Sequence, residues 1–300
     1  MGFTEAMKDT QAWFARMNVA VALLILALTA RTASAAVGTG SSFKGPVGLQ
    51  LYSLRDEFKK EVPSNLDRVQ KYGIKYVELA GTCGQTPEAF KAQLAVDGLI
   101  PIAAHYPLEK FRDDPESIAR EAKAIGLKYA GVAWIPHTGN FTEKDAHETA
   151  VLFNKAGAAM AKHGLKFFYH CHGYEFQPHG KDTLFDVLMT ETDPKLVSFE
   201  MDILWVYFPG QDPVKLLQQY GKRWELVHLK DLKKGVEIGA LTGATDVRND
   251  VVLGSGQIPL PEILKAAKKA GVKYYFIEDE SPSAVEQIPQ SLKFLEQVKW

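Results

Sequence analysis

The chain has 300 residues, 46% of them hydrophobic, and its 35 basic and 36 acidic side chains give a net charge of −1. This near-neutral balance, without a long basic block, argues against a nucleic-acid partner, which normally requires a basic footprint. The length allows one large α/β barrel domain behind a short N-terminal segment. The composition leaves the oligomeric state open, including a homo-oligomer.

Residues 1–35 have the pattern of a secretory signal peptide. Lys8 and Arg16 precede an apolar run from Val19 to Ala30, and Ala33-Ser34-Ala35 follows as a small-x-small cleavage site. The apolar run has about 12 residues, fewer than the roughly 20 that a membrane span needs. We therefore expect a periplasmic or secreted protein without membrane attachment after cleavage; a retained N-terminal anchor is the alternative.

The expected mature chain has a flexible leader over residues 36–45 and one domain over residues 46–300. It contains two cysteines, Cys83 and Cys171, which an exported protein could pair. Cys171 follows His170 in a predicted strand and should point to the opposite side. This arrangement favours two separate free thiols over a disulfide.

Four glycines mark the boundaries between predicted helices and strands. Gly73, Gly126, Gly164 and Gly271 each follow a helix-like stretch and open an apolar run that begins with Ile, Leu or Val. Glycine ends a helix readily because the left-handed conformation costs it no Cβ clash. A repeated helix, glycine and strand sequence predicts βα units around a parallel sheet.

Eight strands are predicted, which indicates a (β/α)8 TIM barrel. An open doubly wound sheet is the alternative, but it usually carries a glycine-rich turn after its first strand, and Tyr52–Asp56 contains no glycine. Helix starts are predicted at Thr86, Asp114, Thr142, Asp212, Leu260 and Ser283. The strands are Val47–Ser53, Lys75–Ala80, Ile100–His105, Tyr129–Trp134, Lys166–His172, Leu196–Asp202, Glu225–Lys230 and Tyr274–Glu278.

The last four apolar strands end in metal-binding residue types: His170 and His172, Asp202, His228, and Glu278. Residues two apart on a strand point to the same side, and a barrel builds its active site at the C-terminal strand ends. We therefore predict one metal site there, with the choice between His170 and His172 open. Two imidazoles with two carboxylates suit Mn²⁺, Zn²⁺, Co²⁺ or Fe²⁺ better than Mg²⁺.

Other strand-end residues are predicted to serve the same site. Glu200 either orients a metal-binding histidine or is a paired core carboxylate. Lys230 either stabilises a developing oxyanion or forms a salt bridge with Glu278 or Glu200. Trp134 and Trp205 either stack on a sugar ring or close the top of the barrel. The residues predicted to contact substrate are Tyr52, Glu78, His105, Trp134, His172 and Trp205.

These residues resemble the sugar phosphate isomerase/epimerase superfamily, the xylose-isomerase-like TIM barrels that include endonuclease IV, inosose dehydratase and the ketose 3-epimerases. The resemblance extends from Val47 to the C-terminus, and its motifs are specific for the superfamily but not for a substrate. It is carried by Leu49–Arg55, Tyr76–Gly81, Tyr169–Phe176, Asp202 with Trp205, and His228–Asp231.

The resemblance implies one divalent metal ion held by His170, Asp202, His228 and Glu278. In the ketose epimerases the strand-five ligand is a glutamate, and two metal-bound glutamates form the acid/base pair. His170 occupies that position here, which argues against two-glutamate epimerisation. Glu278 then remains as the base, with Glu175 or Lys230 as the second proton-transfer group.

The predicted activity is isomerisation or epimerisation of a keto or aldo sugar, or a sugar derivative, through proton abstraction next to the carbonyl. The alternative is a lyase or dehydratase acting on a keto-sugar or keto-glycoside, which shares this first step. His170 favours this alternative without deciding it. An endonuclease-IV-like hydrolase is disfavoured by the charge balance and the export pattern. A non-catalytic sugar-binding barrel is a further class. The expected partner is a small carbohydrate.

Overall fold

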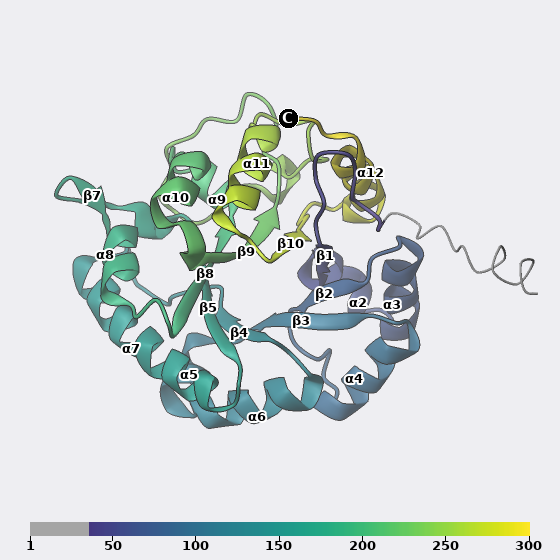
Figure 1. Ribbon diagram of the computed structural model, residues 1–300, viewed down its shortest axis with the longest axis horizontal. Helices are drawn as coiled ribbons and strands as arrows, with labels where there is room; N and C mark the ends of the chain where they lie inside the picture. The colour runs from purple at the N-terminus through teal and green to yellow at the C-terminus, as the bar shows by residue number, and fades with distance from the viewer. Residues whose placement is uncertain (1–35) are drawn as a thin grey trace, which may run out of the picture. The chain divides into compact units, whose positions relative to one another are not determined.

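The computed structural model describes residues 36–300, and these residues form a closed barrel of eight parallel strands surrounded by helices (Figure 1). The predicted signal peptide lies outside these residues. Around the barrel each strand pairs with the next barrel strand along the chain, and the last pairs with the first. The predicted (β/α)8 fold is confirmed.

All eight predicted strands are present. The first is shorter than predicted because the 3-10 helix η1 (Leu51–Leu54) begins directly after it, and the Gln50 side chain caps this helix by accepting from the Tyr52 N–H at 3.0 Å. The barrel strands are β1 (Val47–Gln50), β2 (Tyr76–Leu79), β3 (Ile100–His105), β4 (Tyr129–Val132), β5 (Lys166–His170), β8 (Val197–Asp202), β9 (Trp224–Leu229) and β10 (Tyr274–Ile277). A two-stranded antiparallel hairpin, β6 (Pro178–His179) with β7 (Asp182–Thr183), follows β5.

Six α-helices begin at a predicted start or at the residue after it, several of them with a side-chain cap. Thr142 and Asp145 form a reciprocal capping box. Gly126 and Gly271 end their helices in the left-handed conformation, with φ values of 96° and 90°. The α-helices are α2 (Arg55–Phe58), α3 (Val62–Lys71), α4 (Pro87–Val96), α5 (Leu108–Asp113), α6 (Pro115–Ile125), α7 (Glu143–Lys162), α8 (Leu184–Glu191), α9 (Ile203–Tyr207), α10 (Pro213–Tyr220), α11 (Leu260–Ala270) and α12 (Ala284–Gln297), with 3-10 turns η2 (Tyr174–Phe176), η3 (Gly221–Arg223) and η4 (Val247–Asn249). Of these, the five helices α2, α3, α5, α8 and α9 begin where no helix start is predicted.

A small apolar cluster fills the barrel interior below the polar strand ends. It includes Phe168, Leu226 and Phe276, each fully buried and each two residues before a polar strand-end residue. Because alternate strand residues share a side, this cluster is the floor on which the polar residues sit. Gly131 makes room for it, since a Cβ there would lie 2.4 Å from the Phe168 ring.

The two cysteines are free, as predicted, with Cys83 exposed and Cys171 buried. Of residues 36–45, which the sequence predicts as a leader, Phe43 is buried and packs edge-on against Tyr275 with ring centroids 5.0 Å apart. Within residues 36–300, none of the helices combines the length and the apolar character that crossing a membrane requires.

The long connection after β9 is fastened to the barrel by Asp231. Its carboxylate accepts from the backbone N–H groups of Leu232, Gly254, Gly256 and Ile258 at 2.9 to 3.1 Å. Asp231 is buried, so these charge-assisted bonds are poorly screened and replace the water that the carboxylate has lost. The connection leads into α11 from a fixed starting point.

Replacing Asp231 with Asn should therefore lower the free energy of unfolding by about 2–4 kcal/mol, because one of its two oxygens becomes a donor facing backbone donors. Urea denaturation measures this loss. Asp246→Asn is the matched control in the same connection; its carboxylate is exposed and pairs with Arg248, so its effect should stay within about 0.5 kcal/mol. An Asp231→Asn midpoint equal to that of the parent would contradict the assignment.

Candidate metal centre and cavity

Four strand-end side chains converge at the C-terminal end of the barrel. His170, Asp202, His228 and Glu278 each offer one donor atom, and these atoms lie within 4.8 Å of one another. They come from the ends of β5, β8, β9 and β10, and all four side chains are buried. The convergence follows from the closed barrel, which brings consecutive strand ends to one rim.

The two carboxylate oxygens of Asp202 have different roles: one caps a helix and the other lies in the donor cluster. Its Oδ1 accepts from the backbone N–H groups of Leu204 and Trp205, at 2.8 and 3.1 Å, and so caps α9. Its Oδ2 is buried without a hydrogen-bond partner and lies 3.5 Å from Nε2 of His170. One hydrogen-bonded oxygen thus fixes the other in the donor cluster.

The donor cluster fits a divalent transition-metal ion. Both ring nitrogens of His170 are buried and lack a hydrogen-bond partner, and burial without a partner is costly for a polar atom. Burial, together with His228 and His105, holds the pKa of His170 well below its ordinary value, so the ring is neutral and can donate a lone pair. Two imidazoles with two carboxylates match the ligand preference of Zn²⁺, Mn²⁺, Co²⁺ or Fe²⁺.

Lys230 links the cluster to two further carboxylates, Glu280 and Asp250. Its Nζ lies 2.6 Å from Glu280, 3.2 Å from Glu278, 3.6 Å from Asp250 and 3.7 Å from Asp202. Burial opposes its charge, but these carboxylates outweigh burial and hold its pKa well above the ordinary value. Lys230 is therefore a fixed cation that forms the predicted salt bridge with Glu278.

Lys230 also sets the charge of Glu278. Burial disfavours the ionised form, but Lys230 and His228 outweigh it, and the pKa of Glu278 lies well below its ordinary value. For Asp202, burial dominates and raises the pKa despite Lys230. An anionic Glu278 beside a desolvated carboxyl group at Asp202 gives the cluster an affinity for positive charge.

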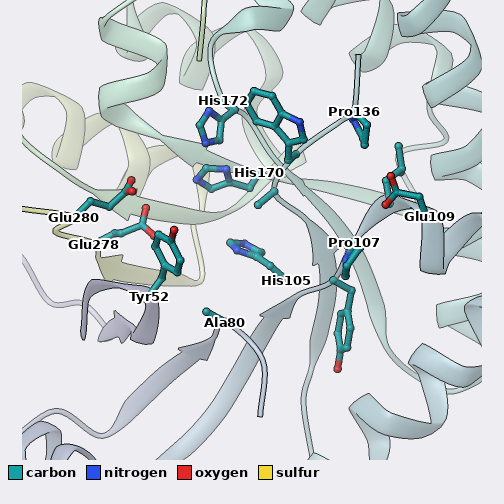
Figure 2. Close-up of a pocket in the computed structure, with 14 residues that line it drawn as sticks. Tyr52, Ala80, His105, Pro107, Glu109, Pro136, His170, His172, Glu278 and Glu280 are labelled. Atoms are coloured by element: carbon teal, nitrogen blue, oxygen red, sulfur yellow. The ribbon is translucent and has the colours of Figure 1, made fainter. Parts of the chain in front are cut away.

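A cavity of about 610 Å³ opens directly above these residues. Figure 2 shows Glu278 and Glu280 next to Tyr52, with His105 and His170 at the centre and His172 beyond them. Trp134, which is 43% exposed, also lines the cavity. The walls thus combine three carboxylates (Glu109, Glu278 and Glu280) and three imidazoles with aromatic and apolar surface, a lining suited to a small polar ligand.

His172 lies at the edge of the cavity rather than in the donor cluster. Its ring stacks on Trp205, with centroids 4.7 Å apart, and meets the Trp134 ring edge-on at 5.1 Å. Burial and the neighbouring His170 lower its pKa to about 3. Its Nδ1 is buried next to Gly243, so the other ring nitrogen, Nε2, is the one that this neutral ring can offer to a ligand hydroxyl in the cavity.

The remaining predicted site residues lie outside the cavity lining. Trp205 is 5% exposed and supports His172 from behind. Glu175 is fully buried and accepts from the His172 backbone N–H at 2.8 Å; burial raises its pKa to about 7. Glu78 and Glu200 are fully buried below the donor cluster, where both approach Nε2 of His228.

Three residues in the site have no role assigned from the sequence. Glu280 is among the polar strand-end residues of the sequence; it follows Glu278 by two positions and lines the cavity. Gln50 is another polar strand-end residue of the sequence. Gln50 bonds Glu78 from the end of β1, and Asp250 reaches Lys230 from the connection after β9. No local pattern identifies Asp250, because its position depends on how that connection folds back.

The chain belongs to the xylose isomerase-like TIM barrel family, whose model matches residues 66–298. Inosose dehydratase 2 of Bacillus cereus is 28% identical over 163 residues, which are 51% of this chain and 53% of that protein. The chain thus matches about half the length of this relative.

Two solved structures show the same fold. A sugar phosphate isomerase/epimerase from Parabacteroides distasonis ATCC 8503 is 26% identical, with a TM-score of 0.72, over 90% of this chain and 99% of that one. The IolI protein, solved with a zinc atom, is 14% identical with a TM-score of 0.64, over 84% of this chain and 95% of that one. The predicted superfamily is confirmed.

Proposed function

We propose that this protein is a metal-dependent lyase that eliminates water, or another group β to a carbonyl, from a keto-sugar or keto-cyclitol. The observation that carries the proposal is the placement of two of the cavity carboxylates on one wall. Glu278 and Glu280 come from the same strand end, and both contact Lys230. The similarity to inosose dehydratase supports a dehydratase over the isomerase or epimerase that the sequence favours.

A divalent ion held by His170, Asp202, His228 and Glu278 would polarise the substrate carbonyl and make the neighbouring C–H bond more acidic. The neutral ring of His172 and the indole of Trp134 orient the sugar in the cavity. His172 contributes Nε2, and Trp134 contributes an apolar face. The buried walls exclude water around the reacting carbon.

Glu278 removes the proton. Among residues 36–300, two side chains lie within hydrogen-bond distance of its carboxylate, and both face Oε2: Lys230 donates at 3.2 Å, and His228 Nδ1 lies at 3.1 Å. Oε1 therefore receives the substrate proton. The electron pair of the broken C–H bond forms a carbon–carbon double bond as the β C–O bond breaks. Glu278 then passes this proton to the departing oxygen, while Glu280 accepts a hydrogen bond from that hydroxyl group and the ammonium group of Lys230 stays charged between the two carboxylates.

Epimerisation would need a proton delivered to the opposite face of the planar intermediate. The sequence places His170 where a second metal-binding glutamate would serve that role, and Glu175 is buried behind His172. Carboxylates grouped on one wall suit removal of a proton and a leaving group from one face. The similarity to the Parabacteroides isomerase/epimerase keeps isomerisation as the second candidate.

The test is to incubate the Mn²⁺- or Zn²⁺-loaded protein with a 2-keto-inositol in D2O and follow it by NMR and ultraviolet absorbance. Loss of water with appearance of a conjugated enone is the expected result. A substrate that gains deuterium but loses no water would instead establish an isomerase, and one whose configuration at the exchanging carbon is inverted would establish an epimerase. No exchange and no product with a panel of keto-sugars would overturn both.

We also propose that the protein is exported. The support is the basic flank, short apolar run and small-x-small site within residues 1–35. Fractionation of cells that express the full chain tests this: the processed protein is expected outside the cytoplasm, and an unprocessed protein in the cytoplasm would contradict it.

A further inference from the structure

A second layer of polar side chains lies directly below the donor cluster. Glu78, His105 and Glu200 reach this layer from β2, β3 and β8, and Gln50 reaches it from β1. Nε2 of His105 lies 3.1 Å from Glu200 Oε2 and 3.6 Å from Glu78 Oε1. Glu78 and Glu200 are fully buried, whereas His105 is partly exposed and also lines the cavity.

His228 connects the two layers through its two ring nitrogens. Nδ1 faces the upper layer, 3.1 Å from Glu278 Oε2 and 3.8 Å from Asp202 Oδ2. Nε2 faces the lower layer, where it is hydrogen-bonded to Glu78 Oε2 and lies 3.2 Å from Glu200 Oε2. A neutral imidazole carries one N–H, and the bond made by that nitrogen decides which one keeps its lone pair.

We infer that Glu78 is a positioning residue for the metal centre. By accepting the Nε2–H of His228, it leaves the Nδ1 lone pair aimed at the donor cluster. A carboxylate behind a metal-binding histidine fixes the tautomer and orientation of the ring and makes it a better donor. This role replaces the substrate contact that the sequence predicts for Glu78, whose side chain is fully buried.

Glu78 is itself held in place from the rim of the cavity. Gln50 donates from Nε2 to Glu78 Oε2 at 2.9 Å, and its Oε1 accepts from the Tyr52 N–H at 3.0 Å. Gln50 is fully buried, and both ends of its amide are engaged. The oxygen that contacts His228 is therefore fixed by a chain of hydrogen bonds that starts at the cavity rim.

Glu78, His105, Glu200 and His228 also lie close enough together to be considered a second metal site. Two observations favour hydrogen bonding instead. Nε2 of His228 is already bonded to Glu78, and His105 Nε2 is already within hydrogen-bond distance of Glu200. A second ion would require His228 to lose its remaining proton and bridge two metals. The lower layer thus supports one ion above it.

The inference rests on the metal site proposed above, and Co²⁺ tests both, because its visible absorption reports ligation without any activity assay. We expect one Co²⁺ per wild-type chain. In Glu78→Gln the affinity, measured by competition with a chelator, should fall about 10- to 100-fold. Gln50→Leu, which leaves Glu78 in place without its anchor, should weaken binding by a smaller factor and alter the same absorption band.

Glu225→Gln is the matched control. Glu225 lies on the same strand as His228 but at its opposite end, where it accepts from the Tyr129 hydroxyl at 2.7 Å. This variant should bind Co²⁺ as tightly as the parent, and the thermal unfolding of each metal-free variant shows whether it is folded. If Gln at position 78 prevents folding, the Gln50 variant provides the comparison.

The outcomes separate the two proposals. Wild-type protein that binds no Co²⁺ would overturn the metal site itself. One bound ion with equal affinity in the parent, Glu78→Gln and Gln50→Leu would overturn the positioning role only. Two ions in the parent and one in Glu78→Gln would show that the lower layer binds metal directly, which also overturns it.

Discussion

Replacing Asp202 with Asn should weaken binding of Zn²⁺ or Co²⁺ at least about 100-fold, because it removes the anionic oxygen that faces the donor cluster. An asparagine oxygen can still cap α9, where Asp202 Oδ1 accepts from Leu204 and Trp205. The metal-free variant should therefore fold as the parent does. The substitution should therefore reduce only the increase in the free energy of unfolding that bound metal provides.

Linkage gives the size of the effect. At a free metal concentration 1,000 times the dissociation constant, binding adds about 4.1 kcal/mol to the free energy of unfolding. A 100-fold weaker site at the same concentration adds about 1.4 kcal/mol by the same relation. Denaturant titrations with and without metal should therefore differ by much less in the variant than in the parent.

Asp212→Asn is the control for this prediction. Asp212 caps α10 with the same geometry, accepting from the Val214 and Lys215 N–H groups, but it lies outside the donor cluster. Its variant should retain the full metal-dependent stabilisation. Equal stabilisation in Asp202→Asn and the parent, or a parent that is indifferent to chelator, would remove Asp202 from the site.

Replacing Glu278 with Gln should slow proton exchange at the substrate carbon next to the carbonyl by about 10²–10⁴-fold, the usual contribution of a general base. The amide has nearly the same shape and retains an oxygen toward Lys230, but it cannot accept the proton. The measurement is deuterium incorporation into a 2-keto-inositol by NMR, with metal content determined on the same sample, because Glu278 also belongs to the donor cluster.

Glu109→Gln is the comparison for Glu278→Gln. Glu109 is an exposed carboxylate that lines the same cavity, so it controls for the loss of a negative charge near the substrate. Its exchange rate should stay within about threefold of the parent, since surface charges act weakly through water. Undiminished exchange in a metal-loaded Glu278→Gln variant would exclude Glu278 as the base.

Much of the fold could be predicted because the start and end of most βα units are marked by residues close together in the sequence. Gly126 and Gly271 end helices, and Thr142 and Asp145 cap one. Period-two alternation then identified which strand-end residues face inward, including His170 and Glu278. It also separated Cys171 from His170, and both cysteines are free in the structure.

Depth inside the barrel could not be predicted in the same way. Alternation indicates that Glu78 faces inward, but its level depends on the stagger between neighbouring strands, which pairs Gln50 with Glu78. The choice between His170 and His172 was open for a similar reason: β5 ends at His170, and the chain then turns. Asp250 joins the site only through the path of a long connection.

The apolar floor formed by Phe168, Leu226 and Phe276 determines where a ligand can enter and leave the barrel. These rings close the barrel under the polar layers, so within the described part of the chain the cavity opens toward the C-terminal rim alone. Under the proposed function, substrate would therefore enter and product leave at this end of the barrel. Exposed residues that line the cavity there, Tyr52 and Trp134, would then affect the rate of product release as well as the strength of binding.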